Sequence, residues 1–235
     1  MKFSISIVLS ILLFACTPAE LQRVLDNVQS SAPLSKADIA KGLKEALKIG
    51  ISKGADELAQ KDGYYKSIYK ILLPDEAMTI INRVKRVPGF GNVETMLLEK
   101  INRAAEDAAT KAKPIFVDAI TGMSFSDAMS ILKGPKNAAT EYLSSATRSQ
   151  LYEAFNPVIV NSLNKMGALD YWTSIVNTYN KIPFIKKMNP KLDDHITRRS
   201  LDGLFSKIEL KEKEIRTNVS ARTSDLLRRV FAKQD

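Results

Sequence analysis

Residues 93–112, VETMLLEKINRAAEDAATKA, give the clearest evidence of the fold class. Their apolar residues return at intervals of three and four, which is the period of one face of an α-helix. These residues are Val93, Leu97, Ile101, Ala104, Ala105, Ala108 and Ala112. The pattern continues to Pro114, where the missing N–H of proline requires the helix to kink or restart. The stretch therefore predicts a long amphipathic helix followed by a second helical run.

The same helical periodicity continues on both sides of this stretch. We predict further helices over residues 35–58, 74–86, 115–120, 124–134, a successor from 135, and then 147–167, 170–180, 193–216 and 224–231. Ser124 with Asp127, and Thr147 with Gln150, are placed to cap helix starts, and Pro157 is expected to interrupt a helix. The chain after the N-terminal segment contains no period-2 run and no internal repeat. The sequence therefore predicts an all-α fold, with a single bundle-like domain of about nine to ten helices over residues 35–235.

The first 34 residues predict export and lipid attachment. Lys2 precedes an apolar run over residues 3–15 that is too short to span a bilayer, and Ala15 directly precedes the only cysteine. This layout is typical of a bacterial signal peptide, residues 1–15, that is cleaved before a cysteine whose thiol is acylated. Residues 16–34 are predicted to form a lipid-anchored segment with a short amphipathic helix and a linker. We therefore expect an outer-membrane lipoprotein on the periplasmic face, attached to the membrane through Cys16.

Composition and charge restrict the classes of partner. Hydrophobic residues make up 45% of the chain, and a single cysteine leaves no disulfide to form. The net charge of +9 is uneven, because residues 181–235 hold 14 Lys and Arg against 8 Asp and Glu. Such a basic quarter suits an anionic lipid surface or a cell-wall polymer, whereas an exported protein rarely meets nucleic acid, so no nucleic-acid partner is expected. A solvated face that serves solubility is the alternative. The basic residues expected to contact an anionic partner are Lys186, Lys187, Arg198, Arg199, Arg228 and Arg229.

An ordered series of short motifs runs through the predicted helical domain. The motifs include Asp62-Gly63-Tyr64-Tyr65, Leu72-Leu73-Pro74, Asn102-Arg103-Ala104-Ala105-Glu106, Ile131-Leu132-Lys133-Gly134, Asp202-Gly203-Leu204-Phe205 and Glu214-Ile215-Arg216. In this order they resemble the bacterial family catalogued as domain of unknown function 4197, over about residues 35–231. The resemblance implies an exported, helical and often lipid-anchored protein. It implies no reaction, ligand or catalytic residue.

One polar cluster is the main candidate for a site. Asn102 and Glu106 share a helix face, as do Arg103 and Asp107, and the alanines beside Glu106 place it near the core. A buried carboxylate must be paired or hold a proton. Partners are expected from the short central helices: Asp127, Lys133, Thr140 and Tyr142. Two interpretations remain, namely a polar pocket with Glu106 as a general acid and a buried network that sets helix register.

The other polar residues carry no catalytic signature. His195 is the only histidine, and we interpret it as a surface residue in the first turn of a helix rather than a metal ligand or triad member. Glu212, Glu214 and Arg216 alternate with lysines, which is typical of a solvated helix face. We therefore assign no catalytic, cofactor-binding or metal-ligating residue.

Three classes of function remain open. The leading hypothesis is a non-enzymatic envelope lipoprotein that acts as a docking or scaffold module for a protein or an anionic envelope component. One alternative is a carrier or binder of a lipid or other apolar ligand in a helix-lined cavity. The other is a cell-wall hydrolase that depends on Glu106. A groove and a core use the same aromatic and aliphatic residues, so the sequence does not separate the first two.

Overall fold

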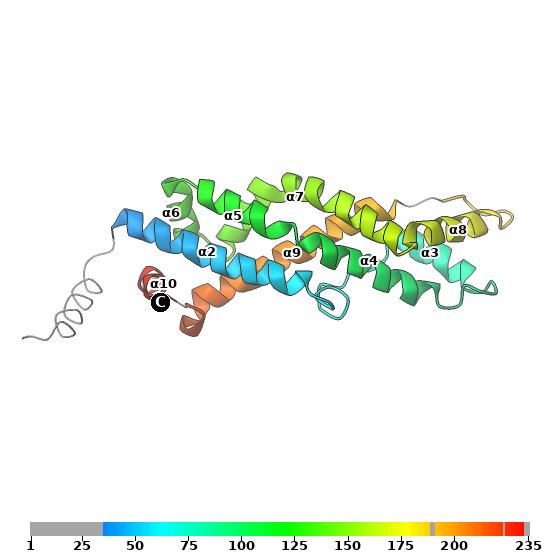
Figure 1. The fold of residues 1–235 in the computed structure, drawn as a ribbon, viewed down its shortest axis with the longest axis horizontal. Helices are drawn as coiled ribbons and strands as arrows, with labels where there is room; N and C mark the ends of the chain where they lie inside the picture. Colours follow the sequence, from blue (N-terminus) through cyan, green and yellow to red (C-terminus); the bar gives the residue numbers. More distant parts are fainter. Residues whose placement is uncertain (1–34, 189–190, 223, 233–235) are drawn as a thin grey trace, which may run out of the picture. The chain divides into compact units, whose positions relative to one another are not determined.

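The computed structural model describes residues 35–188, 191–222 and 224–232, and these residues are helices joined by turns and loops. The predicted signal peptide, Cys16 and the segment 16–34 lie outside the described residues. The elements, labelled as in Figure 1, are α2 (Lys36–Ala59), α3 (Asp75–Val84), α4 (Val93–Ala109), α5 (Ala112–Gly122), α6 (Phe125–Lys133), α7 (Ala138–Lys165), α8 (Ala168–Asn180), α9 (Leu192–Thr217), the 3-10 helix η1 (Val219–Ala221) and α10 (Asp225–Phe231). The all-α class and the single helical domain predicted from the sequence are confirmed for this part of the chain.

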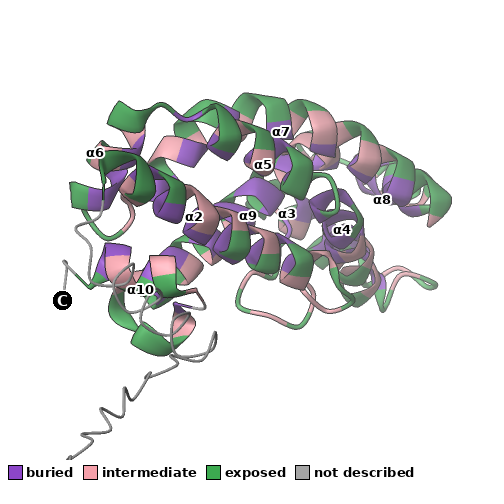
Figure 2. Cartoon of the chain, turned by 60° about the vertical axis from the view of Figure 1, so that its left-hand side comes forward, coloured by how far each residue is buried: buried purple, intermediate pink, exposed green. Residues whose placement is uncertain are grey.

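The four longest helices form the centre of the domain. α4 packs on α7, α7 on α9 and α9 on α2, and α5 covers both α2 and α7. α3 and α8 pair at one end, and α6 and α10 lie against α2 at the other (Figure 1). Buried residues face inward between the helices, whereas exposed residues line their outer sides (Figure 2). The apolar faces predicted from periodicity are therefore the faces that these helices bury against one another.

Most helix boundaries follow the local signals in the sequence. Ser124 and Asp127 form the predicted capping box of α6, in which each side chain accepts the backbone N–H of the other residue. The helical run of 93–112 breaks at Thr110-Lys111, and α5 restarts at Ala112, so that Pro114 lies in the first turn, where a missing N–H costs nothing. Local capping and proline chemistry thus account for both boundaries.

The predicted division of residues 135–167 is wrong, because α7 runs without a break through Thr147 and Pro157. The hydroxyl of Thr147 does not cap a helix start; it donates a 2.6 Å hydrogen bond to the carbonyl oxygen of Leu143, one turn earlier. Pro157 removes one helical hydrogen bond, but Phe155 and Ile159 on either side of it are fully buried. Burial of this apolar face outweighs the local breaking signals.

Helices α2 and α9 approach closely where α2 carries glycine. A β-carbon added to Gly50 would lie 2.9 Å from the Ile215 side chain, and one added to Gly54 would touch the aliphatic stems of Lys207 and Lys211 at 3.5 Å. The lysine stems therefore pack over α2 while their ammonium groups pair with Glu57, at 2.5 Å from Lys207 and 3.2 Å from Lys211.

Within the described ranges, no single helix is long and apolar enough to cross a membrane. Only the combined stretch Val93–Gly122 and Phe125–Lys133, bent by 104° at its break, reaches that length and composition.

Candidate functional site

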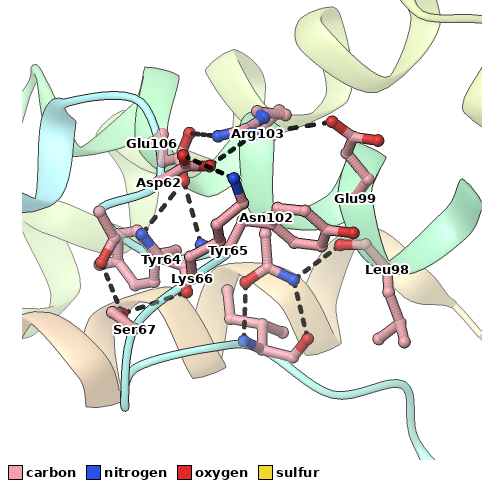
Figure 3. Close-up of polar contacts among 12 residues, drawn as sticks. Asp62, Tyr64, Tyr65, Lys66, Ser67, Leu98, Glu99, Asn102, Arg103 and Glu106 are labelled. Atoms are coloured by element: carbon pink, nitrogen blue, oxygen red, sulfur yellow. Dashed lines mark hydrogen bonds and ion pairs between the residues drawn. The ribbon is translucent and has the colours of Figure 1, made fainter. Parts of the chain in front are cut away.

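Glu106 holds an irregular segment of the chain against α4. The Glu106 side chain is 5% exposed, and its Oε1 atom accepts the backbone N–H groups of Tyr64 and Tyr65, both at 3.1 Å (Figure 3). Its Oε2 atom accepts a 2.8 Å hydrogen bond from Nη1 of Arg103. One carboxylate thus accepts two consecutive backbone N–H groups, the buried one of Tyr64 and the partly buried one of Tyr65, and Arg103 on the same helix offsets its negative charge.

Arg103 connects the Glu106 carboxylate to the turn that opens this segment. Its Nη2 atom lies 2.7 Å from Oδ1 of Asp62 and 3.6 Å from the more exposed Glu99, and its guanidinium lies over the Tyr65 ring. Glu106 raises the pKa of Arg103, and Arg103 in turn holds the pKa of the Asp62 carboxyl below its usual range. Asp62 has a φ of 72°, a backbone conformation that aspartate adopts more readily than most residues.

Asn102 holds the far end of the same segment. Its Oδ1 atom accepts the N–H of Ile71 at 2.8 Å, and its Nδ2 atom donates to the carbonyl oxygen of Ile71 at 2.9 Å (Figure 3). A second bond from Nδ2 reaches the carbonyl oxygen of Leu98 at 2.7 Å. The carboxamide therefore satisfies both polar backbone groups of Ile71, as a neighbouring β-strand would.

Tyr64 ties the segment to α9. Its side chain is fully buried, which raises the pKa of its hydroxyl, and the hydroxyl donates a 2.7 Å hydrogen bond to the carbonyl oxygen of Ser200. Gly203 leaves room for the ring, because a β-carbon there would lie 2.9 Å from Cε1 of Tyr64. We name residues 62–74 the anchored segment, since Glu106, Asn102 and α9 each hold part of it.

The anchored segment presents large apolar side chains to solvent. Ile68 is 83% exposed and Leu72 is 65% exposed, although the backbone between them is held in place. Both line an open groove of about 650 Å³ that also includes His195 on α9. Nε2 of His195 lies 2.9 Å from the carbonyl oxygen of Leu72, which fits the tautomer that carries its proton on Nε2. This arrangement suits contact with another apolar surface.

The structure does not bring the whole predicted polar cluster together. Asn102, Arg103 and Glu106 lie together on α4, whereas none of the expected partners Asp127, Lys133, Thr140 and Tyr142 bonds to Glu106. Asp127 belongs to the exposed capping box of α6, and Tyr142 lines a shallow groove beside it. Thr140 is buried at the start of α7 and bonds to Glu212 instead.

Glu212 and Arg216 form a second buried ion pair, so the interpretation of this region as a solvated face is wrong for these two residues. Their side chains are 4% and 7% exposed. Glu212 accepts the N–H groups of Ala139 and Thr140, each at 2.9 Å, and the Thr140 hydroxyl at 2.8 Å. Arg216 pairs with it at 2.8 Å and donates to the carbonyl oxygen of Ile131 at 2.8 Å. The pair thus satisfies N–H groups in the first turn of α7 through Glu212 and a carbonyl oxygen in the last turn of α6 through Arg216.

A signal for this second pair was present in the sequence. Glu212 lies four residues after Ile208 and three before Ile215, so it shares the buried stripe of α9 rather than the face of its charged neighbours. Arg222 is also a buried charged residue: it is 1% exposed, and its Nε atom donates a 3.1 Å hydrogen bond to the carbonyl oxygen of Ile215. For Glu212, its position on the apolar stripe of α9 predicts burial, whereas the alternation of charges around it does not.

The six predicted basic contact residues do not form one surface. Lys186 and Lys187 are exposed in the loop after α8, and Arg198 and Arg199 lie in the first half of α9, whereas Arg228 and Arg229 lie in α10 at the other end of the domain (Figure 1). Arg198 pairs with Asp194 at 3.0 Å, Arg199 with Asp202 at 3.4 Å and Arg228 with Asp225 at 2.9 Å. These local carboxylates offset much of the positive charge.

The two buried carboxylates are occupied by donors of the protein itself. Both oxygens of Glu106 and both of Glu212 accept hydrogen bonds from the protein. Across the described ranges, no group of three or more His, Cys, Asp or Glu side chains could hold a metal ion.

Comparison with known proteins gives one family. The family described as Protein of unknown function (DUF4197) matches residues 33–232, which include all the helices described above. Neither the curated proteins nor the solved structures give a match.

Proposed function

The chain belongs to the family described as Protein of unknown function (DUF4197), and on that premise we propose that it is a non-enzymatic docking module of the bacterial cell envelope. The anchored segment is its contact surface for a partner protein. The partner chemistry that fits is an apolar pocket or groove that receives Ile68 and Leu72.

One observation carries the proposal: the fold keeps two large aliphatic side chains in water on a backbone that it holds rigidly. Ile68 is 83% exposed and lies between the contact points of Glu106 and Asn102. A merely tolerated surface loop does not need a buried carboxylate and a buried carboxamide to hold it. A preorganised apolar contact gains affinity, because little conformational freedom is lost on binding.

The envelope address rests on the N-terminal sequence. Cys16 carries the acyl anchor, and the protein sits at the outer membrane with its helical domain in the periplasm. Intact-mass measurement of the protein from native membranes tests this part, with an acylated Cys16 expected. Cys16→Ala releases the protein to the soluble fraction, whereas an unmodified Cys16 in membrane-bound protein contradicts the anchor.

The alternative functions receive less support from the geometry. A carrier needs an enclosed cavity, whereas two surface grooves of the domain, of about 850 and 650 Å³, are both open to solvent. A hydrolase needs Glu106 to hold a transferable proton near a second carboxylate, whereas its two oxygens accept three hydrogen bonds from the protein itself.

Site-specific photo-crosslinking in cells tests the docking surface. The acylated full-length protein carries p-benzoylphenylalanine at position 68, and the matched control carries it at position 184, where Phe184 is fully exposed in the loop after α8. We expect one discrete protein adduct from position 68, absent from position 184, and lost when Leu72→Asp is added. The purified adduct protein should also bind the wild-type chain and not Ile68→Asp. Equal adducts at both positions, or none at position 68, would contradict the proposal.

A further inference from the structure

A second surface lies at the other end of α2, along its first half. Here α2 and the start of α6 line an open groove of about 850 Å³ whose lining is mostly apolar. Phe125 is 43% exposed and Ile49 41% exposed at this groove. It is the larger of the two grooves and is separate from the anchored segment, which follows the C-terminal end of α2.

The groove has a positive rim. Lys36, Lys41, Lys44 and Lys48 line it, against one acidic residue, Glu45. Lys44 has a structural role, because its Nζ atom donates to the last carbonyl oxygens of α5, at 3.1 Å to Thr121 and 2.5 Å to Met123. Lys36, Lys41 and Lys48 make no ion pair with a carboxylate of the described chain, so their charge faces solvent.

Apolar side chains surrounded by lysines are typical of a surface that binds a membrane. Exposed aromatic and aliphatic groups enter the boundary between headgroups and acyl chains. Lysine stems lie along the apolar surface while their ammonium groups reach the phosphates. Each lysine near an anionic bilayer strengthens binding about fivefold.

The charge and apolar character of the groove favour a bilayer as its occupant, and its position in the chain places a bilayer within reach. Lys36 comes 20 residues after Cys16 in the sequence. Even a fully extended chain of that length reaches no more than about 70 Å, so acylation at Cys16 keeps the helical domain beside the membrane, within reach of this groove. Attachment turns a weak surface contact into an intramolecular one with a high effective concentration.

We infer that the groove along the first half of α2 binds the anionic phospholipid headgroups of the bilayer that holds Cys16. The inference rests on the envelope address proposed above and adds an orientation to it. Because α2 has 24 residues and is about 36 Å long, the contact places the anchored segment at the opposite end of that helix from the lipid-bound groove.

Vesicle co-sedimentation tests the groove without the anchor. The mature chain from residue 16 carries Cys16→Ser, so that no acyl group contributes, and is mixed with vesicles of phosphatidylglycerol and phosphatidylcholine or of phosphatidylcholine alone. We expect binding only to the anionic vesicles, and weaker binding at higher salt. The triple variant Lys36→Gln, Lys41→Gln and Lys48→Gln should bind about a hundredfold more weakly.

A matched control removes the same charge elsewhere. Lys111, Lys165 and Lys181 are exposed on other parts of the domain, and the triple Gln variant at these positions should bind within about twofold of the parent. A fluorescent reporter, Phe125→Trp, should shift its emission to the blue on anionic vesicles and be quenched by brominated acyl chains. Circular dichroism confirms that each variant is folded.

The inference is wrong if both triple variants lose vesicle binding equally, or if the Lys36, Lys41 and Lys48 triple variant binds vesicles as well as the Cys16→Ser chain does. It is also wrong if the chain binds a monomeric fatty-acid probe but no vesicles. Because the test chain has no acyl group and keeps Ile68 and Leu72, a failure here is distinct from a failure of the Cys16 anchor. It is equally distinct from the absence of an adduct at position 68.

Discussion

Glu106 on α4 accepts the backbone N–H of Tyr64, a residue that lies 42 positions earlier in the chain. The same device occurs a second time in the domain, where Glu212 on α9 accepts the N–H of Ala139, 73 positions earlier. In both cases the carboxylate receives two consecutive N–H groups and pairs with an arginine one helical turn away on its own helix. One pair holds an irregular segment, and the other caps a helix.

Glu106→Gln should destabilise the domain by about 2–4 kcal/mol, because it leaves Arg103 beside a neutral amide and puts an N–H₂ group where an acceptor is needed. Chemical denaturation measures the change in the free energy of unfolding. Glu99→Gln is the matched control, since Glu99 faces the same guanidinium at 3.6 Å but is 52% exposed. Its effect should stay within about 0.5 kcal/mol, and equal effects of the two changes would contradict the buried role of Glu106.

Glu212→Gln should cost a similar amount, about 2–4 kcal/mol, because the first N–H groups of α7 and the Arg216 guanidinium lose a common anionic partner. Glu214→Gln, two residues along the same helix, changes a carboxylate that is 56% exposed and should have little effect. Thermal unfolding of both variants provides the comparison. If Glu214→Gln lowered the stability more than Glu212→Gln does, the buried role of Glu212 would be contradicted.

Gly63→Ala should destabilise the start of the anchored segment by about 1–3 kcal/mol. A β-carbon at this position would lie 2.5 Å from the carbonyl oxygen of Leu58, which is backbone and has little freedom to move. At Gly91 nothing lies within 4 Å of the corresponding position, so Gly91→Ala should change the free energy of unfolding by less than about 0.5 kcal/mol. Hydrogen exchange at Tyr64 and Tyr65 should rise only in the first variant.

The Asp62–Arg103 pair should make stability fall in acid. Arg103 lowers the pKa of Asp62 in the folded state, so below about pH 4 the unfolded chain binds more protons at this residue than the folded one. The stabilisation is therefore complete above the unfolded pKa and is lost as the pH falls through the folded one. Asp62→Asn should be less stable than the parent at neutral pH and should show a shallower loss in acid. Parallel pH profiles for the two proteins would contradict this contribution.

Local patterns were sufficient to predict most of the helices. These patterns involve residues only a few positions apart, so the sequence alone shows them. Examples are the apolar spacing in 93–112, the capping box of Ser124 with Asp127, and the N-cap of α10 at Ser224. Where local signals conflicted with burial, burial prevailed. Thr147 and Pro157 mark a boundary by propensity, yet α7 passes through both because its apolar face is covered by α4 and α9.

The partners of the buried carboxylates followed instead from tertiary packing. The sequence predicted Glu106 near the core with Asp127, Lys133, Thr140 and Tyr142 as partners, whereas Glu106 accepts the N–H groups of Tyr64 and Tyr65. Glu212 has charged neighbours on both sides and is nevertheless buried, because the N–H of Ala139 in the first turn of α7 needs an acceptor there. A hydrogen bond to a residue 42 or 73 positions away exists only once particular helices have packed together, and local periodicity holds no information about which helices those are.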